Sequence, residues 1–186
     1  MKADKAYPKT VKIAEKTITL RPLLEEDGKA ILDFARSLPE EDLLFLSFDI
    51  TDENVVKQWI KYVKSGLWHT IIAENDNKIV GHATLLRTEQ IWTRHLGELI
   101  ILVAPELRGH GLGSKLAFEI FKKAEELKLM KLVARMAATQ KSAIAVFERL
   151  GFRAEALLSD YVIDRKGQTH DLLAMSYDVR GFTQNL

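Results

Sequence analysis

The chain of 186 residues contains no cysteine, which removes several kinds of chemistry before any motif is considered. Disulfides, thiolate metal sites and a cysteine acyl-enzyme are all excluded, because each requires a cysteine sulfur. The five histidines, at positions 69, 82, 95, 110 and 170, lack the spacing of paired metal ligands. We therefore expect no metal in the functional site.

The chain also lacks a strong excess of one charge, since its formal net charge is +1. A nucleic-acid-binding surface normally appears as a strongly basic face, so we expect no nucleic-acid partner. No apolar run approaches the ~20 residues of a membrane span. The N-terminal sequence MKADKAYPKT has no apolar segment of the signal-peptide type. We therefore expect no membrane contact and a cytoplasmic location.

The composition is that of an ordinary globular domain, with 47% hydrophobic and 28% charged residues. A chain of this length suits one domain with its own hydrophobic core. We predict a flexible N-terminus over residues 1–10, a single domain over 11–180 and a C-terminal tail over 181–186.

The most informative stretch runs from Leu99 to Lys115 and reads LIILVAPELRGHGLGSK. It begins as an unbroken apolar run, typical of a strand buried on both faces, and Pro105 ends it because proline cannot donate to a ladder. Glycines follow at 109, 111 and 113, and from Leu112 the apolar residues recur at helical spacing. A helix start of this kind offers free N–H groups and a positive dipole end. It predicts an anion site, most simply for phosphate.

Two familiar phosphate loops do not fit this stretch. A P-loop requires Gly-Lys-Ser/Thr, whereas Ser114 separates Gly113 from Lys115. The dinucleotide fingerprint G-x-G-x-x-G has no placement here. A nucleotide-phosphate binder is therefore disfavoured, and the remaining alternative to a ligand site is an ordinary glycine-rich turn.

The spacing Arg108-x-x-Gly111-x-Gly113, after a strand that ends Val103-x-Pro105, resembles the acyl-CoA pyrophosphate loop of the GNAT superfamily of N-acetyltransferases. Two further stretches support this resemblance. Residues 143–152 (AIAVFERLGF) are similar to the short helix that runs into a Gly-Phe strand start in the family. Residues 20–48 resemble the start of GNAT domains from protein-lysine acyltransferases.

The expected elements agree with that family. The patterns predict strands over 11–20, 68–74, 79–86, 96–103, 131–138, 152–164 and 169–179, and helices over 25–38, 52–65, 112–128 and 141–150, with a tight turn near Glu15 inside the first strand. The resemblance implies an α/β (α+β) fold with one mixed, mainly antiparallel sheet of six to seven strands. Helices would cover both faces, and the sheet would splay between the strand ending at Val103 and the next parallel strand.

The resemblance also implies acetyl-CoA as cosubstrate and a set of residues that binds it. The backbone of the glycine loop would cradle the pyrophosphate, with Arg108 or Lys115 neutralising it or lying solvated on the helix face. The strand at Leu102 and Val103 would bind the pantetheine arm and the acyl carbonyl. The full expected set is Leu102, Val103, Arg108, Gly109, His110, Gly111, Leu112, Gly113, Ser114, Lys115, Gln140 and Phe147, with His110 turned to solvent.

Catalysis by a similar enzyme needs a base, because an amine such as lysine has a pKa near ~10.4 and is mostly protonated at neutral pH. Glu98 is the carboxylate of the 96–103 strand, where similar enzymes carry a catalytic glutamate; the alternative is a structural ion pair. Many family members have a tyrosine at the position of Phe147 to protonate the leaving thiolate. Phenylalanine cannot do so, and Tyr161 or water is the expected substitute.

These features predict an enzyme that moves an acyl group, most simply acetyl, from acyl-CoA directly to a primary amine in a ternary complex. The alternative, based on Phe147, is a catalytically weak CoA-binding regulatory module. A homodimer is also expected, because dimers are common among similar proteins.

The amine acceptor is predicted to be a lysine or another cationic amine. The segment from 39 to 56 has no lysine or arginine, and a rim of one charge attracts the opposite charge. Its acids are Glu40, Glu41, Asp42, Asp49, Asp52 and Glu53, with Leu43, Phe45 and Phe48 as expected apolar walls. The alternative is that these acids serve helix starts and solubility.

Overall fold

The computed structural model describes residues 7–44, 46–164 and 166–180. Its strands are β1 (Lys9–Ile13), β2 (Lys16–Pro22), β3 (His69–Asn75), β4 (Lys78–Leu86), β5 (Leu96–Val103), β6 (Lys131–Ala137), β7 (Arg153–Ile163) and β8 (Thr169–Asp178). Its helices are α1 (Gly28–Ser37), α2 (Glu40–Leu43), α3 (Glu53–Lys64), α4 (Leu112–Glu126) and α5 (Lys141–Arg149), with 3₁₀ turns η1 (Glu25–Asp27), η2 (Ile91–Thr93) and η3 (Pro105–Leu107).

Within these residues the eight strands form one sheet in the order β1-β2-β3-β4-β5-β6-β8-β7. The pair β5–β6 is parallel and the others are antiparallel, which confirms the predicted mixed, mainly antiparallel sheet. The sheet has more strands than the predicted six to seven because the first predicted strand is divided into two strands, β1 and β2. Ala14 and Glu15 have φ values of 46° and 65°, and this turn pairs β1 with β2 as a hairpin.

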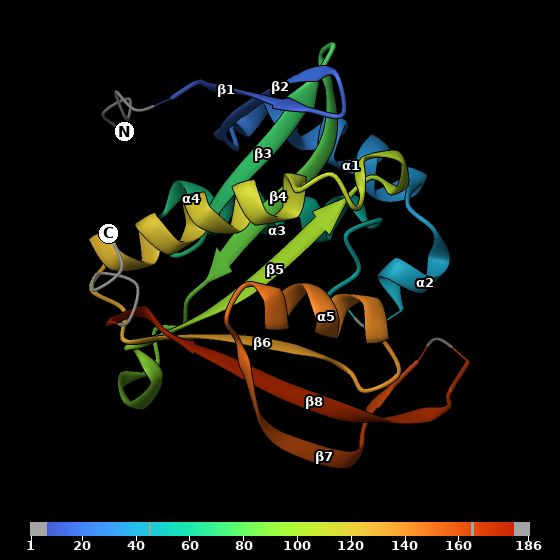
Figure 1. Ribbon diagram of the computed structural model, residues 1–186, viewed down its shortest axis with the longest axis vertical. Coiled ribbons are helices and arrows are strands. Elements are labelled where there is room, and N and C mark those ends of the chain that lie inside the picture. The colour runs from blue at the N-terminus through green and yellow to red at the C-terminus, as the bar shows by residue number, and fades with distance from the viewer. Residues whose placement is uncertain (1–6, 45, 165, 181–186) are drawn as a thin grey trace.

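The helices cover both faces of the sheet (Figure 1). On one face α4 crosses β3, β4 and β5, and its buried apolar residues share a core with Phe147 of α5. On the other face α1 and α3 pack against each other and the sheet, with Ile31 and Trp59 buried in a second core. Helical spacing of apolar residues in each segment accounts for this arrangement, because each helix buries one stripe.

A buried polar chain crosses the α1/α3 face of the sheet. Trp59 Nε1 donates to Thr70 Oγ1 at 2.9 Å, Thr70 Oγ1 lies 3.0 Å from Thr84 Oγ1, and Thr84 Oγ1 lies 3.2 Å from His82 Nδ1. Burial lowers the pKa of His82 to about 3, so this ring is neutral at physiological pH. These hydrogen bonds attach α3 to β3 and β4, and they leave Nε2 of His82 buried without a partner.

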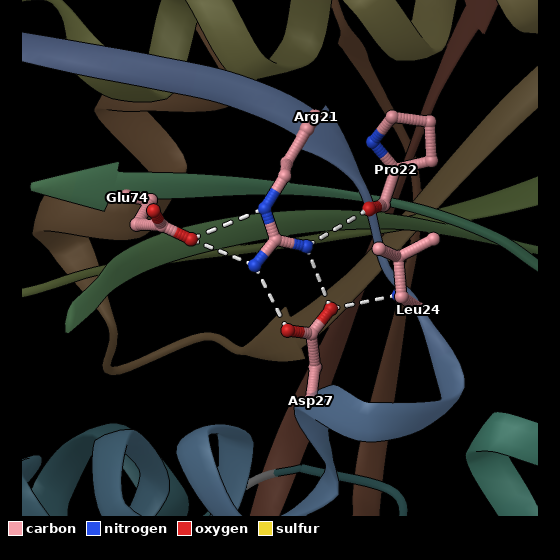
Figure 2. Close-up of polar contacts among 5 residues, drawn as sticks. All are labelled: Arg21, Pro22, Leu24, Asp27 and Glu74. Atoms are coloured by element: carbon pink, nitrogen blue, oxygen red, sulfur yellow. Dashed lines mark hydrogen bonds and ion pairs between the residues drawn. The ribbon is translucent and has the colours of Figure 1, made fainter. Parts of the chain in front are cut away.

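A second network holds the start of α1 to the sheet (Figure 2). Arg21 of β2 donates to both carboxylate oxygens of Asp27 at 2.7 and 2.8 Å and to Glu74 of β3 at 2.7 and 3.1 Å. Arg21 also reaches the carbonyl of Pro22 at 3.3 Å, and Leu24 N–H donates to Asp27 at 2.7 Å. One guanidinium therefore joins two strands to the turn that opens α1.

This network sets the pKa values of its members. Burial by itself would raise the pKa of Asp27, but the hydrogen bonds from Arg21 and from Leu24 N–H outweigh it and hold that pKa below its ordinary value. The hydrogen bond to Asp27 raises the pKa of Arg21 in turn. Both groups are charged over the physiological range.

We expect Asp27→Asn to lower the free energy of unfolding by about 1–3 kcal/mol near neutral pH, because it leaves the half-buried Arg21 under-satisfied. A carboxylate with a depressed folded pKa gives its full stabilisation above the unfolded pKa of about 3.9, and loses it as the pH falls through the folded pKa. Urea unfolding of both proteins should therefore show stabilities that converge in acid. Asp33→Asn is the control: its side chain is 62% exposed, and we expect a loss below about 0.5 kcal/mol. A difference that stays constant down to about pH 2.5 would contradict the prediction.

Candidate functional site

A fork between the two parallel strands forms the site. β5 and β6 pair at Leu96 with Lys131, Gly97 with Leu132, and Glu98 with Val133, and then part. A cavity of about 820 Å³ opens where they separate. Its walls are β5 from Glu98 to Val103, the glycine loop with the start of α4, one side of α5, and parts of β6, β7 and the segment after α2. This separation confirms the predicted splay between the strand that ends at Val103 and the next parallel strand.

Gly97 allows the closed end of the fork to pack tightly. A Cβ at this position would lie 2.4 Å from Leu85 Cδ1 and 2.9 Å from Leu129 Cδ1, well inside normal contact distance. The last paired positions therefore sit directly under the core at the end of α4.

Residues from both faces of the sheet line the cavity at the fork. Side chains alternate along a strand; Leu99 packs into the core with α4, whereas Leu102 packs against the core with α1 and α3. The cavity has lining residues of both kinds. The cavity therefore lies against the α4/α5 layer on one face of the sheet and against the α1/α3 layer on the other.

The glycine loop borders the α4/α5 side of the cavity. Gly109 and Gly111 have φ values of 77° and 86°, and Gly111 is the N-cap of α4. A Cβ at Gly113 would lie 3.8 Å from Ile101 and Val103, facing the cavity. Of the expected loop residues, those that line the cavity are Arg108, Gly109, Gly111, Leu112, Gly113 and Ser114. His110 and Lys115 are exposed and lie outside that lining.

The backbone of β5 presents alternate residues to the fork. Ala104 N–H donates to Val80 O at 2.9 Å, while Val103 stands opposite Gly81. The alternation of an antiparallel pair then turns the backbone groups of Leu102 toward β4, and those of Val103 and Ile101 toward the fork. Sequence reasoning selected Leu102 and Val103 and missed Ile101, because strand register is not visible in the sequence. Leu102 contributes its side chain to the cavity wall.

Arg108 connects the loop to the opposite wall. Its Nε donates to Val103 O at 2.9 Å, and its Nη2 pairs with Asp42 of α2. Both side chains line the cavity, with 43% of the Arg108 side chain and 18% of the Asp42 side chain exposed. The guanidinium therefore spans the mouth of the cavity from the end of β5 to α2.

Glu98 and Arg135 join β5 to β6 just beyond their last backbone pair. Arg135 Nε donates to Glu98 Oε1 at 3.1 Å and its Nη2 to Oε2 at 2.5 Å. Hydrogen bonding to Glu98 raises the pKa of Arg135, so the guanidinium stays charged. The structure thus shows the ion pair that was the alternative to a catalytic base, and it places that pair in the cavity wall. Arg135 was missed in the sequence, although it is a charged residue within an otherwise apolar strand.

The other predicted site residues also border the cavity. Phe147 is nearly buried and packs edge-on against Phe152, with ring centroids 5.0 Å apart. Tyr161 enters from β7 with 61% of the residue exposed. Gln140 Oε1 accepts a hydrogen bond from Ala137 N–H at 3.1 Å, which shapes the turn from β6 into α5. Among the described residues that line the cavity, Tyr161 therefore supplies a phenol, whereas position 147 supplies no hydroxyl.

The acidic segment divides between the cavity and the fold. Asp52 caps α3 by accepting from Asn54 N–H at 2.6 Å, and Glu53 pairs with Lys57. Asp49 accepts from Thr51. Among the residues that the structure describes, Asp42 is the member of the acidic run that lines the cavity. Sequence reasoning overstated the rim, because acids at a helix start have the same composition as acids around a cleft.

The described residues expected to form apolar walls of the cavity are likewise part of the core rather than of the cavity lining. Leu43 is buried in the α1/α3 core, and Phe48 packs against that core. Phe45 lies outside the described residues. Leu44 and Leu46 line the cavity instead. A one-residue register difference in an irregular segment is enough to exchange core and cavity positions.

Two further features concern residues 7–44, 46–164 and 166–180 as a whole. No group of three histidine, aspartate or glutamate side chains there could hold a metal ion. No helix in the same ranges combines the length and the apolar character that crossing a membrane requires.

The structure therefore combines a forked sheet with a glycine-rich helix start beside the fork, and helix starts of this kind favour anions. The model of the acetyltransferase (GNAT) family matches residues 30–152, which is most of the chain. The chain therefore belongs to the GNAT acetyltransferase family. No curated protein matches it.

Solved structures with the same fold span almost the whole chain. A ribosomal-protein-alanine N-acetyltransferase from Brucella melitensis is 26% identical, with a TM-score of 0.74 over 86% of this chain and 98% of its own. The yncA protein from Salmonella typhimurium, solved with its cofactor acetyl-CoA, is 20% identical with a TM-score of 0.76 over 87% and 94%. Spermidine/spermine N-acetyltransferase SpeG from Vibrio cholerae is 19% identical, with a TM-score of 0.69 over 90% and 96%.

The two interpretations of Glu98 predict different kinetics. If Glu98 accepts the amine proton, Glu98→Gln should lower kcat by roughly 10²–10⁴-fold and leave CoA affinity unchanged. Arg135→Gln should then also lower kcat and leave CoA affinity unchanged, because Arg135 orients the carboxylate of Glu98. Steady-state rates from about pH 6 to about pH 9 measure both.

A purely structural pair would behave differently. Both variants would then lower the midpoint of thermal unfolding to a similar extent and keep a wild-type pH profile. That result would remove Glu98 from catalysis.

Proposed function

We propose that this protein is an acyl-CoA-dependent N-acyltransferase, with acetyl-CoA as its donor, that moves the acyl group directly to a primary amine. The observation that carries the proposal is the fork: backbone pairing of β5 and β6 ends at Glu98, and a cavity of about 820 Å³ passes between the strands. A cavity lined from both faces of the sheet suits a ternary complex, in which donor and acceptor meet without a covalent enzyme intermediate. The absence of cysteine agrees with direct transfer.

The donor would lie on the α4/α5 side. Its pyrophosphate would bind the N–H groups at the start of α4, where the helix dipole favours an anion. Its pantetheine arm would run along β5, whose Ile101 and Val103 backbone groups face the fork. A backbone N–H there would hold the acyl oxygen as negative charge develops on it, and one well-placed donor of this kind is worth about 3–4 kcal/mol.

The acceptor would lie on the α1/α3 side, near Glu98, Arg135, Tyr161 and Leu46. The amine nitrogen attacks the acyl carbon, its proton passes to Glu98 or to water, and the thiolate leaves with a proton from Tyr161 or water. We propose a lysine or another cationic amine as acceptor. Two proteins with this fold support an amine acceptor by their names: one is a spermidine/spermine N-acetyltransferase, and the other is a ribosomal-protein-alanine N-acetyltransferase.

A second candidate function is a CoA-binding regulatory module with weak turnover. Two observations favour it: Phe147 provides no hydroxyl at the cavity, and both oxygens of Glu98 are engaged by Arg135. The two functions share CoA binding and differ in turnover. An acetyl-CoA activity screen against polyamines, amino acids and lysine peptides separates them, because the module would bind CoA and turn over every amine only weakly.

CoA binding through the loop is tested at Gly113 rather than Gly111. The φ of 86° at Gly111 makes any side chain there strained, so a variant would confound binding with folding. Gly113 lies in the helix, and its added Cβ meets neighbours at an ordinary 3.8 Å. We expect Gly113→Val to weaken CoA binding at least tenfold, or roughly 1.4 kcal/mol, by filling the anion site. Gly113→Ala should have a smaller effect.

Calorimetry gives the affinity for CoA, and thermal unfolding shows whether each Gly113 variant folds. A folded Gly113→Val protein with wild-type affinity would show that the donor does not approach this loop.

The thiolate acid is tested by a pair of variants. Tyr161→Phe removes the phenol that lines the cavity, and we expect a fall in kcat of roughly 10-fold or more with CoA affinity retained. Phe147→Leu removes only packing, and we expect most of the activity to remain. A greater loss of kcat for Phe147→Leu than for Tyr161→Phe would mean that Tyr161 is not the acid.

A further inference from the structure

The ion pair between Arg108 and Asp42 links the two halves of the cavity. Arg108 follows β5 on the glycine loop, and Asp42 lies on α2, which is anchored by Leu43 in the α1/α3 core. The residues just beyond Asp42, Leu44 and Leu46, line the acceptor side. A single contact therefore connects the proposed donor loop with the proposed acceptor wall.

The charges in the cavity wall nearly compensate one another. Among the described residues, its charged side chains are Asp42, Glu98, Arg108, Arg135 and Arg149. Arg135 binds both oxygens of Glu98, and Arg108 binds one oxygen of Asp42. With Arg108 in this position, each carboxylate among the described lining residues, Asp42 and Glu98, is already paired with an arginine. A cationic amine would therefore meet only carboxylates that are already neutralised.

A pyrophosphate at the start of α4 would compete with Asp42 for Arg108. The pyrophosphate carries two negative charges, whereas the carboxylate of Asp42 carries one. Arginine–phosphate pairs are also strong, charge-assisted contacts. The Arg108–Asp42 pair is partly exposed, and pairs of that kind contribute little to stability. The exchange of Arg108 from the carboxylate to the phosphate is therefore favourable.

We infer that Asp42 is the acceptor-recognition residue, and that the donor makes it available by drawing Arg108 away. This inference rests on the proposed function and adds to it the residue that recognises the cationic acceptor, Asp42, and the exchange that releases this residue from Arg108. Before the donor binds, Asp42 is neutralised. Once the donor binds, the carboxylate of Asp42 can attract a positively charged acceptor into the cavity.

A double-mutant cycle on CoA affinity tests the exchange without any need for turnover. Isothermal titration with CoA compares wild type, Asp42→Asn, Arg108→Gln and the double variant. We expect Asp42→Asn to tighten CoA binding about threefold to tenfold, because Arg108 no longer has a competing partner. In the Arg108→Gln background the same change should shift Kd less than about twofold.

The control is Glu41→Gln, which neutralises the neighbouring acid; Glu41 is exposed and lies outside the cavity lining. This variant should leave Kd for CoA unchanged. An Asp42→Asn effect of equal size in both backgrounds would show long-range repulsion of the phosphates and overturn the exchange. So would an unchanged Kd in Asp42→Asn.

Acceptor recognition is measured by rates with acetyl-CoA and three probes: spermidine, a lysine peptide with a blocked N-terminus, and glutamate. We expect Asp42→Asn to raise KM for the better cationic probe roughly tenfold, with kcat within about twofold. A preference for glutamate, or an unchanged KM, would overturn the role of Asp42. Tight CoA binding without turnover of any probe would overturn the proposed function and the acceptor role together, and the cycle would still decide the exchange.

Discussion

The cavity depends on the end of one backbone ladder. Beyond Glu98 and Val133 the strands β5 and β6 stop pairing, so the fork-facing backbone groups of Ile101 and Val103 need other partners. Unsatisfied backbone groups away from water are costly, and they are usually paired. The guanidinium of Arg108 supplies one partner at the Val103 carbonyl. A ligand that carries amides could supply the other partners, which is why the end of the β5–β6 pairing supports the proposed site for the pantetheine arm.

Side-chain packing and hydrogen bonds on both faces of the sheet keep β5 and β6 apart beyond the fork. On one face, the core under α4 holds β5 through Leu99, Leu112 and Leu116. On the other face, the series of hydrogen bonds that begins at Trp59 and ends at His82 holds β3 and β4. The Arg21 network holds α1 in place over that second face. With β5 secured on the β4 side and β6 secured by β8, the two strands cannot collapse onto each other beyond the fork.

Local patterns were sufficient for most of the fold and for the loop. Apolar alternation located the strands, and the glycines after Pro105 identified the start of α4, because those signals act within a few residues. Partners set by long-range register were not predictable. The contacts of Glu98 with Arg135, and of Arg108 with Asp42, join positions 37 and 66 residues apart. The acid run 40–53 shows the converse limit: one composition serves a helix cap at Asp52 and a cavity wall at Asp42.

Two arginine–carboxylate pairs border the same cavity, and their geometry gives them different roles. Arg135 projects from a strand, engages both oxygens of Glu98, and bridges the fork next to its last backbone pair. A two-point contact between two strands resists exchange, because both bonds must break together. Arg108 projects from a loop that follows β5 and engages one oxygen of Asp42. The pair of Arg135 with Glu98 therefore braces the fork, whereas the one-point pair of Arg108 with Asp42 is the one for which we propose an exchange of partners.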